Sequence, residues 1–125
     1  MFAVNDDSTI LCTRGDVGGL YVQATFGGEA YTFRPLDVVR LKVFGKKDCE
    51  TVVLQKSVTV HEETTQVEIM LSGDDTKFGE VISKPTDYWY EIELNPDTNP
   101  QTIIGYDEDG AKIFKLFPEG KDVTA

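Results

Sequence analysis

Apolar residues recur at every second position along most of the chain, in short runs that end at turn-forming residues. A period of two is typical of a half-buried β-strand, and no stretch carries a sustained period of 3.6 residues. The pattern predicts strands over these ranges: 8–13, 19–25, 31–33, 38–44, 51–60, 66–71, 87–94, 101–106 and 111–117. We therefore expect an all-β domain of eight or nine short strands.

The clearest alternation lies in the segment 87–94. One parity carries Tyr88, Tyr90, Ile92 and Leu94, and the other carries Trp89, Glu91 and Glu93. Bulky apolar side chains at alternate positions are typical of a strand that covers a core with one face. We expect the tyrosines to pack inside and Trp89 to cover the outer face of the sheet.

Turn-forming residues separate the runs at intervals of about 8–12 residues, a spacing typical of two-sheet antiparallel β-sandwiches and of barrels. A sandwich is the commoner of the two and is the expected architecture. The pair Asp109-Gly110 tolerates positive φ angles and predicts a hairpin that joins 101–106 to 111–117. The loop 72–79 has room for one helical turn.

The length of 125 residues fits one domain, 1–125, in which 1–7 and 121–125 are expected to be flexible ends. Twenty-two acidic residues against 12 basic ones give a formal net charge of -10. Nucleic acids and anionic membrane surfaces need clustered cations, so neither is an expected partner. No apolar stretch approaches the ~18 residues of a membrane span. The start lacks the pattern of a secretory signal, so we expect synthesis in the cytoplasm.

Residue types that carry catalysis are sparse or lack a recognisable spacing. The one histidine, His61, has no partners at metal-ligand or catalytic-triad spacing, and no glycine-rich phosphate-binding motif occurs. The acidic run 107–109 lacks the spacing of a calcium loop and is expected to be solvated. Cys12 and Cys49 are expected to be buried thiols, with a single bridge between them left open. We expect no catalytic residue, cofactor or metal.

Two segments carry residues suited to binding a partner. Trp89, with Glu91 and Glu93 on the same strand face, would provide a large contact area and suit a cationic partner. The tripeptide Arg14-Gly15-Asp16 is the one that integrin ligands display, although ordinary turn chemistry also explains it. The candidate partner-binding residues are therefore Trp89, Glu91, Glu93, Arg14 and Asp16.

The order of several segments along the chain carries a resemblance to a known family. The segments are Thr9 to Asp16, 31–33 followed by 37–44, 67–71 leading to Asp75-Thr76, 88–94, 101–104 and 116–120. In this order they resemble the amino-terminal domain of the baseplate upper proteins of tailed phages that infect Gram-positive bacteria, and of related prophage proteins. The resemblance implies an immunoglobulin-like β-sandwich that docks into a tail tip or baseplate by protein–protein contacts and carries no catalysis.

We therefore expect a structural module located in a phage or prophage virion. Its expected partners are other tail or baseplate proteins, and a second copy of the chain is a further candidate. One alternative is a carbohydrate- or cell-surface-binding sandwich, in which Trp89 and neighbouring tyrosines stack on sugar rings. Another alternative is an intracellular binder of a cationic protein, which the acidic net charge would favour.

Overall fold

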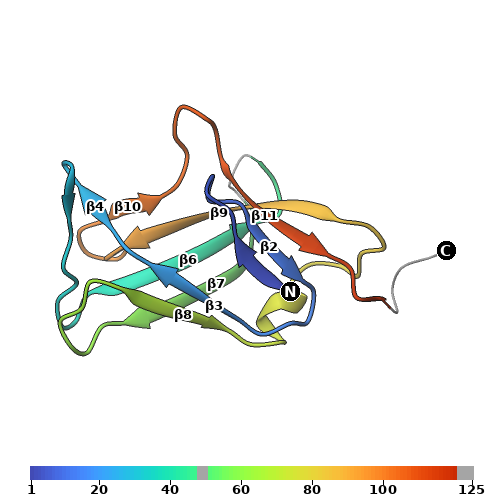
Figure 1. Cartoon of the computed structure of the whole chain (residues 1–125), viewed down its shortest axis with the longest axis horizontal. Coiled ribbons are helices and arrows are strands. Elements are labelled where there is room, and N and C mark those ends of the chain that lie inside the picture. Colours follow the sequence, from blue (N-terminus) through green and yellow to red (C-terminus); the bar gives the residue numbers. More distant parts are fainter. Residues whose placement is uncertain (48–50, 121–125) are drawn as a thin grey trace.

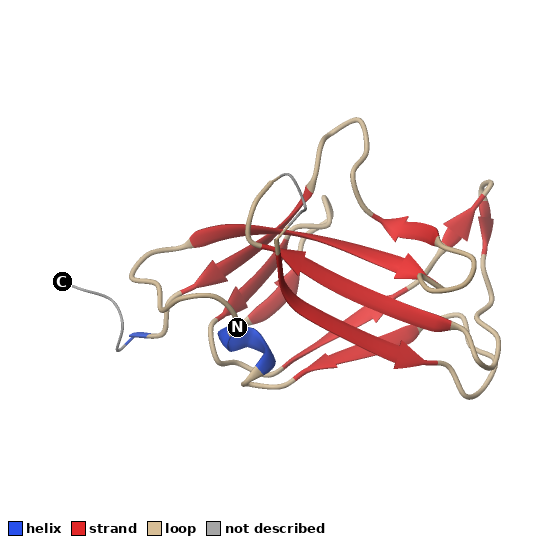
Figure 2. Cartoon of the chain, turned by 180° about the vertical axis from the view of Figure 1, so that it is seen from behind, coloured by secondary structure: helices blue, strands red, loops and turns tan. Residues whose placement is uncertain are grey.

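The computed structural model describes residues 1–47 and 51–120. Nearly all of its regular structure is β-strand, as predicted (Figures 1 and 2). The strands are β1 (Phe2–Val4), β2 (Ile10–Thr13), β3 (Gly18–Val22), β4 (Thr25–Phe26), β5 (Glu29–Ala30), β6 (Val38–Phe44), β7 (Val52–Thr59), β8 (Val67–Leu71), β9 (Thr86–Leu94), β10 (Gln101–Ile104) and β11 (Lys112–Phe117). A short 3-10 helix, η1 (Asp75–Lys77), lies between β8 and β9, where the sequence predicts one helical turn.

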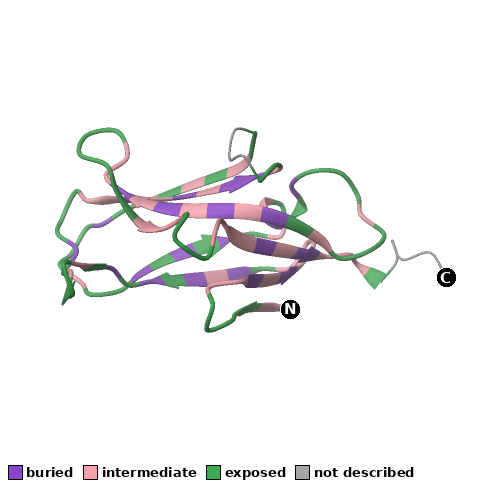
Figure 3. Ribbon diagram, turned by 90° about the horizontal axis from the view of Figure 1, so that it is seen from above, coloured by how far each residue is buried: buried purple, intermediate pink, exposed green. Residues whose placement is uncertain are grey.

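The strands form one large sheet and two small ones. The large sheet has seven strands, in the order β1-β2-β11-β9-β6-β7, with β10 also paired to β9. Strands β3 and β8 form a separate antiparallel pair, and β4 and β5 form a short hairpin. Seen from above, the strands lie in two layers, so the fold has the character of a β-sandwich (Figure 3).

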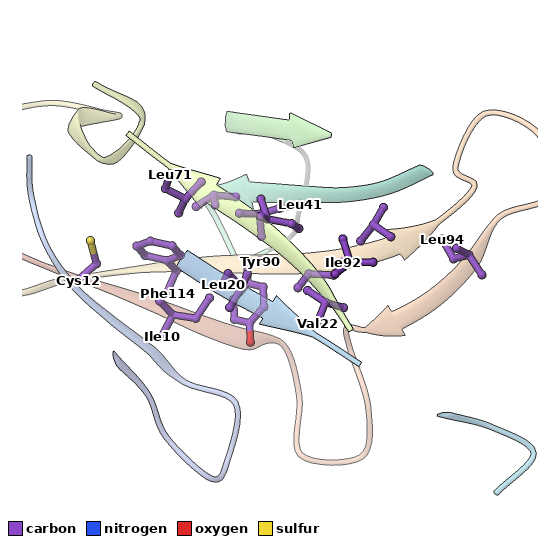
Figure 4. Packing of buried hydrophobic residues seen from close by; sticks show 14 of the residues in the cluster. Ile10, Cys12, Leu20, Val22, Leu41, Leu71, Tyr90, Ile92, Leu94 and Phe114 are labelled. Atoms are coloured by element: carbon purple, nitrogen blue, oxygen red, sulfur yellow. The ribbon is translucent and has the colours of Figure 1, made fainter. Parts of the chain in front are cut away.

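Buried apolar side chains from the large sheet and from the β3–β8 pair form one core (Figure 4). From β9 the core takes Tyr88, Tyr90, Ile92 and Leu94, which is the parity predicted to point inward. The β3–β8 pair supplies Leu20, Val22, Val67, Ile69 and Leu71. Because side chains alternate between the two faces of a strand, a slip of one residue in any of these strands would expose its share of the core.

Two features of the predicted sandwich are wrong in detail. The described ranges contain eleven strands rather than eight or nine: β1 and the two-residue strands β4 and β5 are additional, whereas the predicted strand 31–33 is only an isolated bridge between Phe33 and Thr64. The large sheet is also not antiparallel throughout, because β2 and β11 run parallel, with Ile10 beside Phe114 and Cys12 beside Leu116. The pattern within one strand does not specify the direction of a partner from the other end of the chain.

The predicted hairpin between β10 and β11 does not form. Both strands are antiparallel to β9 and lie along the same edge of it, with Thr102 opposite Glu93 and Lys112 opposite Tyr90. They therefore run in the same direction and do not pair with each other. The tight turn itself is present in the loop that rises between them, since 107 and 110 exchange backbone hydrogen bonds of 3.3 and 2.9 Å (Figure 1).

The start of the chain is a strand rather than a flexible end. Strand β1 pairs antiparallel with β2, and the Phe2 ring packs over Gly18 at the start of β3. A Cβ atom on Gly18 would lie 2.2 Å from the ring atom Cδ2, so only glycine leaves room for the ring. Strand β1 thus ties the large sheet to the β3–β8 pair. The other predicted flexible end, 121–125, lies outside the described residues.

Cys12 lies in β2 and its free thiol is buried, as predicted. Burial raises the pKa of this thiol to about 11, so the reactive thiolate is scarce at neutral pH. Cys49 lies outside the described residues.

Replacing Gly18 with alanine is expected to lower the free energy of unfolding by about 1–3 kcal/mol, the usual cost of overpacking. The new methyl group would need the space of the Phe2 ring and would displace β1. Urea denaturation followed by fluorescence measures the change.

The double variant Gly18→Ala/Phe2→Ala provides the control. Once the ring is removed, the methyl group has room, so the double variant should lose less stability than the sum of the two single variants. Strictly additive losses would contradict the contact between Phe2 and Gly18.

Candidate partner-binding surfaces

The five predicted binding residues lie in two separate places. Trp89, Glu91 and Glu93 point outward from β9, on the face of the large sheet away from the core, and all three are half-buried. Arg14 and Asp16 lie in the loop between β2 and β3, where they contact the segment of η1. The structure therefore brings the first three residues together and leaves the other two at a different surface.

Trp89 belongs to a row of apolar side chains that crosses the outward face of the large sheet. Strand register places Phe44 of β6 opposite Trp89 on one side and Ile113 of β11 opposite it on the other. Val52 of β7 lies opposite Phe44 and is 46% exposed. None of these four side chains belongs to the core cluster, but Phe44 is only 3% exposed, so Trp89, Ile113 and Val52 form the accessible part of the row. Val52, Phe44, Trp89 and Ile113 are called the apolar row below.

Charged side chains flank the apolar row and are paired with one another. Arg40 on β6 forms a two-point ion pair with Asp97, with N–O distances of 3.0 and 2.8 Å. The Nε of Arg40 also donates to the Ser57 hydroxyl at 2.8 Å. Lys42, which lies closer to the apolar row, is 3.9 Å from Glu93. These contacts restrict the long side chains and give the apolar row an ordered polar border.

The negative charge of Glu91 is disfavoured in the folded protein. Partial burial raises the pKa of its carboxyl group, and the charge and hydrogen bond of Glu93 raise it further, whereas Lys42 lowers it. The two carboxyl groups share one strand face and one nearby ammonium group, so their repulsion is only partly compensated. A cationic group from a partner would relieve this repulsion, and binding of such a partner to this face stays a prediction.

The loop that contains Arg14 and Asp16 is held by contacts within the chain. The Thr76 hydroxyl accepts a hydrogen bond from the Gly15 amide at 3.0 Å and donates to the Asp16 carbonyl at 2.8 Å. The Arg14 guanidinium donates to the Lys77 carbonyl at 3.1 Å, and the Asp16 carboxylate pairs with the N-terminal ammonium. Both charged groups therefore have structural partners, and binding of an external partner by them stays a prediction.

A third surface has no counterpart in the sequence analysis. An open hollow of about 790 Å³ lies between the turn that joins β1 to β2 and the segment 102–113. Its lining includes the acidic residues Asp6, Asp7 and Asp109, together with Tyr106, whose side chain is 75% exposed. The hollow brings together two parts of the chain that are far apart in sequence.

The sequence analysis did not predict Phe44, Ile113 or Val52 as part of a surface, and only Phe44 has a sequence signal that could have shown it. Phe44 ends the run 38–44 out of phase with the alternating buried residues of β6, and an aromatic residue at that parity indicates the outer face, although Phe44 itself is only 3% exposed. Ile113 and Val52 carry no such signal, because their place in the apolar row depends on strand register. From the sequence, the acidic run 107–109, which contributes to the lining of the hollow, is expected only to be solvated.

Within the part of the chain that the structure describes, no three His, Cys, Asp or Glu side chains gather in a way that could hold a metal ion. No helix in the same ranges combines the length and the hydrophobicity needed to cross a membrane.

Replacing Thr76 with valine is expected to cost about 1–3 kcal/mol of unfolding free energy. Thr76 is fully buried, and valine would leave the Gly15 amide without its acceptor. Chemical denaturation measures the loss. The exposed Thr65→Val variant is the matched control and should change stability little; equal effects at both positions would contradict the role of the Thr76 hydroxyl.

Replacing Glu91 with glutamine is expected to raise the melting temperature at pH 7, by about 2 °C. Because the folded-state pKa of Glu91 is raised, its ionised form lowers stability at neutral pH. That cost disappears as the pH falls through the folded-state pKa toward the ordinary value of 4.5, so the gain should shrink near pH 4.

Thermal melts of both proteins between pH 4 and pH 7 test this expectation, with Glu62→Gln in an exposed loop as the control. A lower melting temperature for Glu91→Gln at pH 7 would show that the charge of Glu91 is favourable and would contradict the arrangement described above.

Comparison with known proteins gives no guide to these surfaces. Neither a protein family, nor a curated protein, nor a solved structure matches the chain.

Proposed function

We propose that this chain is a structural docking module of a phage or prophage virion, an assembly component of the baseplate or tail tip that acts through protein–protein contacts. The observation that carries the proposal is the apolar row of Val52, Phe44, Trp89 and Ile113 on the outward face of the large sheet. The proposal assigns no catalysis to the chain.

The apolar row has the composition of an interface centre. Protein–protein interfaces combine a dry apolar patch, rich in aromatic residues, with a polar border. Here the half-buried Trp89 is the aromatic residue that a partner could contact, and the buried Phe44 lies beside it on β6. The ion pairs of Arg40 and Lys42 lie next to them. The row crosses four hydrogen-bonded strands, so its side chains are held in place before a partner arrives, and little ordering is needed on binding.

The virion context is supported by the order of segments that resembles the amino-terminal domain of baseplate upper proteins. Several of these segments coincide with whole strands of the fold, among them 38–44, 67–71 and 101–104. An immunoglobulin-like arrangement of the sandwich is part of the same proposal. The two-layered, all-β architecture is compatible with it.

The carbohydrate-binding alternative is less well supported. In that interpretation, tyrosines next to Trp89 would stack on sugar rings together with it. Tyr88 and Tyr90 are only 9% and 3% exposed and belong to the core, so they are not accessible to a sugar. Trp89 alone, half-buried within the apolar row, suits a flat protein contact better than a sugar platform.

The test is to purify virus particles from cells that encode the chain and to quantify the chain by mass spectrometry. The wild-type chain is expected to sediment with the tail proteins in a fixed ratio. The Trp89→Ala variant is expected to be reduced about thirtyfold in particles, the effect of losing a central interface anchor of ~2 kcal/mol.

Tyr21→Ala is the matched control, because Tyr21 is an exposed aromatic residue of the β3–β8 pair, 61% accessible. It should assemble as the wild type does. Thermal melts establish that both variants are folded. Absence of the folded wild-type chain from intact particles would contradict the virion role, and a glycan-binding screen would then test the carbohydrate alternative.

A further inference from the structure

One strand position in the large sheet is vacant. Strands β10 and β11 lie end to end along the same edge of β9, and β2 covers β11 by pairing with it. Within the described ranges no strand pairs with the outer edge of β10. The hollow of about 790 Å³ lies beside this edge, between the segment 102–113 and the turn that joins β1 to β2.

The backbone along this edge retains unused hydrogen-bonding groups. Gly105 and Tyr106 continue from β10 into the lining of the hollow. Neither forms a backbone hydrogen bond with another of the described residues. An unpaired strand edge with free amides and carbonyls is a template on which an extended segment can add as a further strand.

Both walls of the hollow are fixed by contacts within the protein. On one side, the buried Tyr90 hydroxyl donates to the Ser8 carbonyl and holds the β1–β2 turn. On the other side, Lys112 forms an ion pair of 2.8 Å with Asp107. A site whose walls are already ordered loses little conformational entropy when a ligand enters.

The charges that line the hollow are mostly negative. Four carboxylates, Asp6, Asp7, Asp107 and Asp109, face one ammonium group, that of Lys112. The Thr9 amide lowers the pKa of Asp7, and Lys112 lowers the pKa of Asp107, so both carboxylates stay ionised at neutral pH. The side chains of Asp6 and Asp109 form no hydrogen bond or close ion pair with another described residue, although the charge of Asp109 acts on Lys112, whose close partner is Asp107. Both carboxylates can therefore pair with a ligand.

The negative charge of the hollow determines which kind of segment can add to the edge of β10. A second copy of the chain would bring the same carboxylates against themselves, and like charges that face each other across strands are destabilising. An acidic or neutral segment would leave the carboxylates uncompensated. A segment that carries lysine or arginine would compensate them, and the exposed Tyr106 ring offers a face for a cation.

We infer that the outer edge of β10 and the hollow beside it bind an extended, basic segment of a protein partner, which adds to the large sheet as a further strand. The hollow shares Ile113 with the apolar row, but the edge of β10 and the carboxylates of the hollow are not part of that row, so the inference does not rest on the proposed virion function. The bound segment needs free backbone amides and carbonyls to pair with β10, and lysine or arginine side chains to pair with the carboxylates of the hollow.

A capped peptide of alternating lysine and valine is the probe, and NMR titration of the full chain is the measurement. Binding is expected to shift the amide signals of 103–106 and to slow hydrogen exchange at Gly105 and Tyr106. Higher salt should weaken it. The same peptide with glutamate in place of lysine should not bind, and N-methylation of alternate peptide amides should abolish binding because it removes the strand pairing.

A pair of charge-matched variants tests the contribution of the hollow. Asp6→Asn/Asp109→Asn should weaken the basic peptide about fivefold, the effect of losing two exposed ion pairs. Glu62→Gln/Asp74→Asn removes two exposed charges outside the lining of the hollow and should leave the affinity unchanged.

Three results would overturn the inference. Equal binding of the N-methylated peptide would show attraction by charge without strand pairing. Equal weakening by both double variants would show that the hollow has no special role. Amide shifts at 103–106 caused by oligosaccharides, with none caused by the basic peptide, would assign the hollow to a sugar.

Discussion

The whole arrangement depends on strand β9 keeping one register with neighbours on both of its edges. On one edge β9 pairs with β6, and on the other with β10 and β11. Its inward residues supply four large side chains to the core, whereas Trp89, Glu91 and Glu93 face outward. Because the side chains of a strand alternate between faces, core and outward face are set by the same register, and a slip of one residue would exchange them.

Local alternation was enough to predict what each strand buries, but not how strands far apart in sequence meet. The inward parity of β6, β8 and β9 follows from the pattern of apolar residues. The turn at Asp109-Gly110 was also correctly identified, but the hairpin was wrong, because pairing of both strands with β9 outweighed the local preference. The docking of Phe2 on Gly18 depends on the close approach of two layers, which no local pattern reports.

The same limit applies to the candidate surfaces. Parity alone places Trp89, Glu91 and Glu93 on one face, and the structure agrees. The other members of the apolar row cannot be predicted without the register of four strands. The hollow cannot be predicted without knowing that the β1–β2 turn lies next to the loop after β10. The tripeptide at 14–16 shows a different limit: turn chemistry explains it from the sequence, but only the structure shows that the distant residue Thr76 of η1 holds this loop by hydrogen bonds.

Because β2 pairs in parallel with β11, the large sheet can form completely only late in the synthesis of its strands. The two strands come from near the two ends of the described ranges, and among the described strands β11 alone joins β2 to β9. During synthesis, the edge of β2 that pairs with β11 therefore stays unpaired until β11 has left the ribosome. Contacts between distant segments form late and slowly. The large sheet is thus completed only once β11 has been made and has paired with both β2 and β9.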